Sequence, residues 1–406
     1  MLELDGRSLT FEQFRDSCLK PNVPAIIRHA APRSYVSDCG CGSEACFSPL
    51  DVMQSRLAPI SIAAAFGKDH MLPITETFVT SSVDGQMACG EKSLSDVVAC
   101  WRDGSRVLYL KDWHMQAEME AMTHSSCAQC LPEGASRGPD SGDAGSAEEQ
   151  PPVVVQTLHG NGMYRVPRYL GPDWMDEFCR FSQEGEINYQ YFGRKKSDYR
   201  FAYIGPPDTW TPLHFDVFGT YSWSLNVCGE KLWFFPTLEG NEALLASGLG
   251  GIALAPDIRT TTGAELHGIV QHPGDLVFVP SRYLHQVHNI KGPYFPLPQV
   301  DTGEETDGGV SLIISINHNW CNEWCIEKMV ETFCTDAKRL GSLLGDEERV
   351  ALFSDDVEAW HDHVEAMLLG GTNWNFGCIR SFLSHRLRAI EAAASVGTEG
   401  ERVRRL

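Results

Sequence analysis

The chain has 406 residues, of which 43% are hydrophobic and 10% aromatic, so it can bury the core of one large domain or two and is not a disordered protein. Its 33 lysine and arginine residues against 54 aspartate and glutamate residues leave a formal net charge of -21. This charge has the wrong sign for binding phosphate backbones, so we do not expect a nucleic acid as a direct partner.

The N-terminal segment MLELDGRSLTFEQF has neither the basic nor the apolar region of a secretory signal, and no stretch approaches the ~20 apolar residues of a membrane span. We therefore expect a cytoplasmic protein, or a nuclear one, with no membrane partner and with its 14 cysteines reduced. Two groups offer candidate zinc ligands: Cys39, Cys41 and Cys46, and Cys127 with Cys130. Because the first group lacks C-x2-C spacing and more than eighty residues separate the two, we expect surface-loop cysteines there.

The N-terminal part of the chain, residues 1–115, has a mixed pattern that predicts an α/β region packed on the following domain. Residues 9–20 have apolar side chains at helical spacing, and residues 107–113 have the composition of a strand. An acidic insertion rich in Gly, Ser and Pro follows at 116–160, and its part 131–152 contains almost nothing to bury. We expect this insertion to be disordered.

Residues 161–320 contain several short β-rich runs separated by Gly, Pro and Asp turns. These runs are YRFAYIG, TPLHFDVFGTYSWSLNVCGEKLWFFP, GDLVFVP, HQVHNI and GVSLIISINHNW. Short strands without intervening helices predict an antiparallel sandwich or barrel and not a Rossmann sheet. Residues 321–406 have the pattern of a C-terminal helical region, so the whole chain is expected to be mainly β with flanking helices.

A histidine and an aspartate, His214 and Asp216, lie two positions apart at the start of one of these runs. Residues i and i+2 of a strand point to the same face, so both side chains can reach one metal ion. A third ligand would complete a 2-His-1-carboxylate set with open positions, as Fe(II) oxygenases use. Chance alone predicts about two His-x-Asp/Glu matches in such a chain. The second, His363 with Glu365, lies in a helical pattern in which i and i+2 diverge, so we expect a solvated helix face there.

The run after Asp216 alternates in a way that predicts a cavity. One face would carry Tyr221, Trp223, Leu225 and Val227, and the other Ser222, Ser224 and Asn226. A buried strand whose second face is small and polar is expected to line a pocket.

Lys231 follows at the start of an aromatic strand, LWFFP. Burying a lysine there is costly unless an anion meets it, and the carboxylate of a dicarboxylic cosubstrate would suit a compact ammonium. The alternative is a lysine at a strand end with its ammonium in water.

The third ligand is expected on a later strand, where His285 and His288 would point to opposite faces. We favour His285, because Val287 and Asn289 would share its face and a polar Asn can support a metal ligand. His288 would then pack outward.

Together these residues resemble a known family. His214-x-Asp216, Lys231 and the segment GDLVFVPSRYLHQVHN are similar to the JmjC-domain Fe(II)- and 2-oxoglutarate-dependent oxygenases, which are cupin-type double-stranded β-helices with jelly-roll architecture. The segments LYLKDWH, SWSLNVCGEKLW and SINHNW resemble a cytosolic branch of lysyl hydroxylases in that family. The resemblance covers roughly residues 9–30 and 95–325, interrupted by the acidic insertion.

The resemblance implies specific roles for individual residues. Three of them would be the catalytic iron ligands: His214, Asp216 and His285. Lys231 would bind the C5 carboxylate of 2-oxoglutarate with the help of the Thr211 hydroxyl, and Asn317 would line the same pocket. Some relatives carry an asparagine where Ser224 stands, which leaves the role of Ser224 in the pocket open.

The function that the resemblance implies is a protein hydroxylase that uses Fe(II), 2-oxoglutarate and dioxygen. Its target would be carbon in a lysine side chain of the eukaryotic translation termination factor. One alternative is an N-methyl-lysine demethylase, although the chain shows no zinc finger or basic tail to hold it on chromatin. Another is a catalytically silent cupin that serves as a binding module. The sequence predicts no oligomeric state.

Overall fold

The computed structural model describes residues 1–34, 47–77, 87–120, 164–184, 198–247, 257–260, 265–298, 309–354 and 356–404. The two cysteine groups and the segment 131–152 lie outside these ranges. Residues 115–120 are helical, so this helix continues from the N-terminal region into the segment 116–160 assigned above to the insertion. The division of the chain into four regions remains a prediction.

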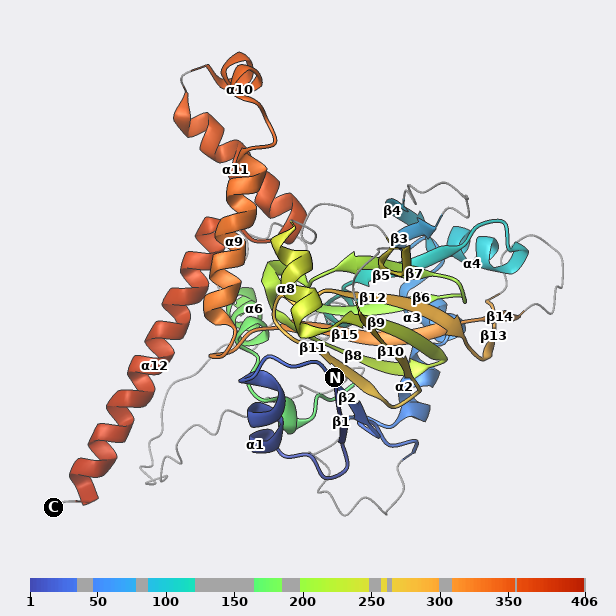
Figure 1. The fold of residues 1–406 in the computed structure, drawn as a ribbon. Helices are drawn as coiled ribbons and strands as arrows, with labels where there is room; N and C mark the ends of the chain where they lie inside the picture. The colour runs from blue at the N-terminus through green and yellow to red at the C-terminus, as the bar shows by residue number, and fades with distance from the viewer. Residues whose placement is uncertain are drawn as a thin grey trace, which may run out of the picture.

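Two β-sheets form the centre of the molecule (Figure 1). The major sheet contains, in spatial order, β1 (Leu2–Asp5), β2 (Ala25–Arg28), β11 (Leu276–Val279), β8 (Tyr221–Cys228), β15 (Ile313–Trp320), β6 (Arg200–Gly205), β5 (Leu108–Trp113), β3 (Met71–Thr77) and β4 (Met87–Ser93). The minor sheet contains β10 (Leu266–Gln271), β9 (Glu230–Pro236), β12 (His285–Lys291) and β7 (Trp210–His214). A separate hairpin pairs β13 (Tyr294–Pro296) with β14 (Gly309–Ser311).

The chain passes repeatedly from one sheet to the other. β6, β8, β11 and β15 belong to the major sheet, whereas β7, β9, β10 and β12 belong to the minor one. Within the described ranges β1 and β2 pair in parallel, and the other paired strands are antiparallel. This winding is that of a double-stranded β-helix, so the expected cupin-type jelly roll with flanking helices is confirmed.

The described strands of the N-terminal region join the major sheet. β1 and β2 extend the major sheet at one edge, and β5, β3 and β4 extend it at the other. These edge strands hydrogen-bond directly to the central ones, β2 to β11 and β5 to β6. The N-terminal residues therefore widen the sheet that carries the pocket.

The alternation expected in β8 decides which of its side chains face the core. Tyr221, Trp223 and Leu225 pack in the large hydrophobic core. The small polar residues Ser222 and Ser224 between them are buried as well. The opposite face of the strand is thus free to line a polar space inside the protein.

Helices cover the outside of the sheets. In the N-terminal half they are α1 (Phe11–Phe14), η1 (Arg15–Leu19), α2 (Leu50–Leu57), α3 (Pro59–Phe66), α4 (Leu94–Asp103), η2 (Arg168–Leu170) and α6 (Trp174–Glu184). Later in the chain they are η3 (Val217–Gly219), α8 (Leu238–Ala246), η4 (Ile258–Thr260), α9 (Ile326–Gly341), α10 (Asp346–Phe353), α11 (Val357–Thr372) and α12 (Phe376–Arg404). The predicted C-terminal helical region is present, and α12 runs away from the sheets toward the C-terminus (Figure 1). Of the helices described, none combines the length and the apolarity needed to cross a bilayer.

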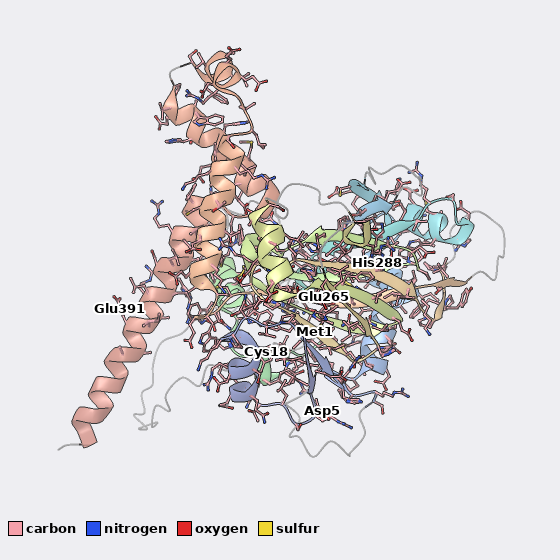
Figure 2. The ribbon with its side chains drawn as sticks, viewed as in Figure 1. Met1, Asp5, Cys18, Glu265, His288 and Glu391 are labelled. Atoms are coloured by element: carbon pink, nitrogen blue, oxygen red, sulfur yellow. The ribbon has the colours of Figure 1, made fainter. Side chains whose placement is uncertain are left out.

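The helix expected at residues 9–20 is shorter and changes type. Thr10 caps α1 through a reciprocal capping box with Gln13. The next five residues form a π-helix in which the Lys20 N–H donates to the Arg15 carbonyl. Cys18, labelled in Figure 2, is buried in this turn, so the apolar face predicted for the helix does pack on the core.

Candidate metal centre and cosubstrate pocket

Three side chains meet at one end of the minor sheet. His214 is the last residue of β7, His285 is the first of β12, and the two are cross-strand partners. Asp216 lies two residues after the end of β7. One ligand atom from each residue lies within 4.8 Å of the others, and the Asp216 Oδ2 is 4.0 Å from the His285 Nε2. The structure thus brings together the three predicted ligands, as a metal ion requires.

Backbone hydrogen bonds orient both imidazoles. The Nδ1–H of His214 donates to the Pro212 carbonyl at 2.8 Å, and that of His285 donates to the Tyr283 carbonyl at 3.1 Å. Since a carbonyl can only accept, each ring carries its proton on Nδ1 and keeps a lone pair on Nε2. Burial lowers the pKa of His214 to about 3, with a further contribution from His285, and burial also lowers the pKa of His285. Both rings are therefore neutral at physiological pH, as metal ligands must be.

The candidate ligand Asp216 lies on a short loop that is fixed at two points. The Ser222 hydroxyl on β8 donates to the Asp216 Oδ2 at 2.6 Å. Phe218, two residues further, has a φ of 56° and is fully buried. Its ring lies 5.4 Å from Phe333 of α9 and 5.7 Å from Trp374, which follows α11. The C-terminal helices therefore hold the loop on which the carboxylate lies.

Lys231 is buried between the sheets and is not a strand-end residue with its ammonium in water. Only 2% of the residue is exposed, and its Nζ donates to the Ser315 hydroxyl at 2.5 Å. Burial lowers its pKa to about 7, and among the described residues no carboxylate forms an ion pair with it to compensate for the lost hydration. The Lys231 side chain, the three candidate ligands and Thr211 line the same pocket.

Asn317 of β15 also lines this pocket. Ser224 contributes through its hydrogen bond to the side chain of Asn317. The Ser224 hydroxyl donates to the Asn317 Oδ1 at 3.0 Å, so it orients the amide. Asn289, expected to support His285, instead donates from its Nδ2 to the Thr209 hydroxyl at 2.6 Å. This hydrogen bond of Asn289 therefore stabilises the loop before β7 and not the imidazole of His285.

Sequence reasoning missed several residues of the lining. These are Tyr109, Lys111, Tyr203, Trp233 and Asn319. Period-two alternation could have found Trp233, which lies two positions after Lys231 in β9. The same rule places Tyr109 and Lys111 on one face of β5, but nothing local shows that β5 borders the pocket.

The other candidate histidines lie away from the pocket. His288, labelled in Figure 2, points to the opposite face of β12, where its ring stacks on Trp210 at 5.3 Å between centroids. His363 lies in α11 and contacts the rings of Phe353 and Trp360. Neither belongs to the group of converging ligand atoms.

This geometry separates the two histidines of β12 experimentally. His285→Ala should weaken Mn(II) binding by more than about 100-fold, because it removes a metal-ligating nitrogen, whereas support residues cost 10- to 100-fold. His288→Ala should leave Mn(II) affinity unchanged and lower stability through the lost stacking on Trp210. Isothermal titration calorimetry measures the Mn(II) affinity of both variants, and thermal unfolding measures their stability. The reverse result would mean that β12 is shifted by one residue.

Comparisons with known proteins identify relatives of this chain. No family model matches the chain. It is 28% identical over 312 residues to the mouse protein named 2-oxoglutarate and iron-dependent oxygenase JMJD4, covering 72% of this chain and 55% of the relative. The human protein of the same name is 30% identical over 248 residues, covering 57% and 50%. The chain resembles the JmjC oxygenases typified by JMJD4. The resemblance drawn from the sequence is thereby confirmed.

A third relative carries a different name. The Arabidopsis thaliana protein named arginine-specific demethylase JMJ20 is 25% identical over 378 residues, covering 88% of this chain and 64% of the relative. The chain spans about half the length of the JMJD4 proteins that it matches.

Proposed function

We propose that this protein is an Fe(II)- and 2-oxoglutarate-dependent dioxygenase that hydroxylates a protein side chain. The observation that supports the proposal is that a buried lysine, Lys231, which has no carboxylate partner among the described residues, lines one pocket with two neutral imidazoles and a carboxylate. A metal and a dicarboxylic cosubstrate would together satisfy these groups. With iron, 2-oxoglutarate and dioxygen bound, the centre would supply oxidation of 2-oxoglutarate to succinate and CO2 and insertion of one oxygen atom into a C–H bond.

The residues of the chain have distinct tasks in this proposal. His214 and His285 would bind iron through Nε2 and Asp216 through a carboxylate oxygen, which leaves positions open for cosubstrate and dioxygen. Lys231 would donate to the C5 carboxylate of 2-oxoglutarate, and Thr211 would donate a second hydrogen bond. Asn317 would present its amide to the same cosubstrate. Lys231, His285 and Thr211 are buried, so their contacts with a bound group would be stronger than in water.

We further propose a lysine side chain of the eukaryotic translation termination factor as the target, with hydroxylation on carbon in the cytoplasm. Support comes from the segments LYLKDWH and SINHNW, which resemble those of lysyl hydroxylases, and from the similarity to JMJD4. The test incubates the purified protein with Fe(II), 2-oxoglutarate and lysine peptides of that factor. Succinate formation that rises with one peptide, together with one added oxygen atom in its mass, is the expected result. No succinate under any condition would exclude the enzymatic proposal and favour a silent cupin that only binds.

A demethylase is the second candidate, because the Arabidopsis relative named a demethylase aligns with most of the chain. Both reactions begin by hydroxylating carbon, but on an N-methyl group the product loses formaldehyde. Methyl-lysine and methyl-arginine peptides tested beside unmodified ones separate the two. Formaldehyde release from a methylated peptide, without oxygen retained on the unmodified peptide, would favour the demethylase.

The depressed pKa of Lys231 predicts a pH dependence of cosubstrate binding. In the free protein this lysine is charged below pH about 7 and neutral above it. Above that pH the protein must take up a proton to pair with a carboxylate. The affinity for N-oxalylglycine, an unreactive analogue of 2-oxoglutarate, should therefore fall as pH rises from 7 to 9, approaching about tenfold per unit. Titrations with Mn(II) bound check this, and a flat profile would mean that Lys231 stays charged throughout.

A further inference from the structure

The strand β5 contains an irregularity beside the pocket. Leu110 pairs with Ile204 and Trp113 with Ala202, so two residues of β5, Lys111 and Asp112, stand opposite the single residue Tyr203 of β6. This is a β-bulge, a feature that re-aims side chains and is common next to active sites.

The bulge changes where the Asp112 side chain points. In a regular strand Asp112 would share the face of Leu110, which is buried in the core, opposite to that of Lys111. Instead Asp112 has a φ of 60°, a conformation that costs free energy for a residue other than glycine. Its Oδ1 accepts a hydrogen bond of 2.6 Å from the hydroxyl of Tyr203, a residue of the pocket lining.

Asp112 is fixed by a hydrogen bond through Oδ1, and its Oδ2 can still accept a hydrogen bond. Its side chain is 56% exposed, and its Oδ2 lies 3.6 Å from the Lys111 Nζ, too far for a hydrogen bond. Partial burial raises its pKa, but Lys111 and the Tyr203 hydroxyl outweigh this and hold the pKa below its usual value. Asp112 is therefore an ionised carboxylate with one oxygen unused by hydrogen bonds to the described residues.

Among the described residues, the pocket lining contains no carboxylate apart from the candidate metal ligand. The one carboxylate in its lining is Asp216, which belongs to the candidate metal ligands. A cationic substrate side chain entering beside the iron would need a counter-charge, because an unpaired ammonium is costly to desolvate. Asp112, in contact with two lining residues, Lys111 and Tyr203, is placed at the border of the pocket to provide one.

We propose that Asp112 is the specificity-determining residue that binds the terminal cation of the substrate side chain, with Tyr203 as its positioning residue. This inference rests on the proposed function and names the substrate class of the same site, a cationic side chain. Asp112 would hold the end of that side chain while an aliphatic carbon lies over the metal. Lys111 would be the internal cation that the substrate displaces from the carboxylate.

The test compares two capped peptides that differ in one residue, lysine or its uncharged analogue norleucine, flanked by glycine and serine. Dissociation constants are measured with Mn(II) and N-oxalylglycine bound, so the readout does not depend on turnover. Wild type should bind the lysine peptide at least about tenfold more tightly than the norleucine peptide. In Asp112→Asn this ratio should fall to about one, since asparagine tolerates the positive φ and removes only the charge. Tyr203→Phe should reduce the ratio partially.

The matched control is Asp208→Asn, at another exposed aspartate with positive φ, 69°, on the loop between β6 and β7. It should keep the wild-type ratio. An unchanged ratio in Asp112→Asn, equal binding of the two peptides by wild type, or no binding of the lysine peptide would overturn the inference. Failure of wild type to bind Mn(II) and N-oxalylglycine would instead overturn the proposed function, and the inference with it. Binding of a methyl-arginine peptide in the same assay, compared between wild type and Asp112→Asn, shows whether Asp112 also binds a guanidinium.

Discussion

His214→Ala and Asp216→Ala are expected to abolish 2-oxoglutarate turnover while the fold survives. Each removes one of three converging ligand atoms, and the two that remain bind Fe(II) weakly. Mn(II) affinity should fall by more than about 100-fold, beyond the loss seen for residues that only support a ligand. Succinate formation and calorimetric Mn(II) titration measure the two effects. Thermal unfolding shows whether the fold persists, since Asp216→Ala also leaves the Ser222 hydroxyl without its acceptor.

The matched control is His363→Ala, in the chain's other His-x-Asp/Glu sequence. His363 contacts aromatic rings on the C-terminal helices, so its loss should affect stability alone. Turnover lost in His363→Ala and kept in His214→Ala would show that the wrong site has been assigned.

Lys231→Ala is expected to weaken binding of 2-oxoglutarate and N-oxalylglycine while Mn(II) binding persists. The substitution leaves the C5 carboxylate unpaired in a buried pocket, which costs about 2–5 kcal/mol, or roughly 30- to several-thousand-fold in affinity. Lys231→Arg should be impaired too, because a planar guanidinium does not fit a site that holds a compact ammonium against Ser315. Equal N-oxalylglycine affinity in wild type and Lys231→Ala would mean that another residue binds the C5 carboxylate.

Thermal stability provides an independent check on the same residue. The folded pKa of Lys231, about 7, lies below the ordinary value of 10.5, so the unfolded chain binds more protons between these values. The cost of burying the ammonium is therefore fully present below pH 7 and fades as pH rises toward 10.5. At pH 7 or below, Lys231→Met should melt at a higher temperature than wild type without ligand, and gain less from N-oxalylglycine. A variant that melts lower in both conditions would mean that Ser315 already compensates the charge.

The local pattern of the sequence predicted the central part of the site. His214 and Asp216 were expected on one side of a strand end, and His285 was preferred to His288 because of the residues that share its face. The structure places the three together and His288 on the opposite face. Their role as iron ligands remains a prediction. These expectations required only the rule that alternate residues of a strand point to the same face, and a short segment is enough to apply it.

Features that depend on distant partners were not predictable in the same way. The bulge at Lys111 and Asp112 exists only because β5 pairs with β6, and Tyr203 comes some ninety residues later in the chain. The edge strands of the N-terminal region gave no local sign of which sheet they would join. The π-helix at residues 15–19 likewise interrupts a pattern that is helical throughout. In each case tertiary pairing overrides a local preference that points elsewhere.

Because Phe218 packs between Phe333 and Trp374, the candidate metal site is completed late during synthesis of the chain. The loop with Asp216 is held by rings that the ribosome adds more than a hundred residues later. A nascent chain that already contains β7 to β12 has both histidines and Ser222, but it still lacks the aromatic packing that holds the loop. We therefore expect newly made chains to bind metal tightly only near the end of translation.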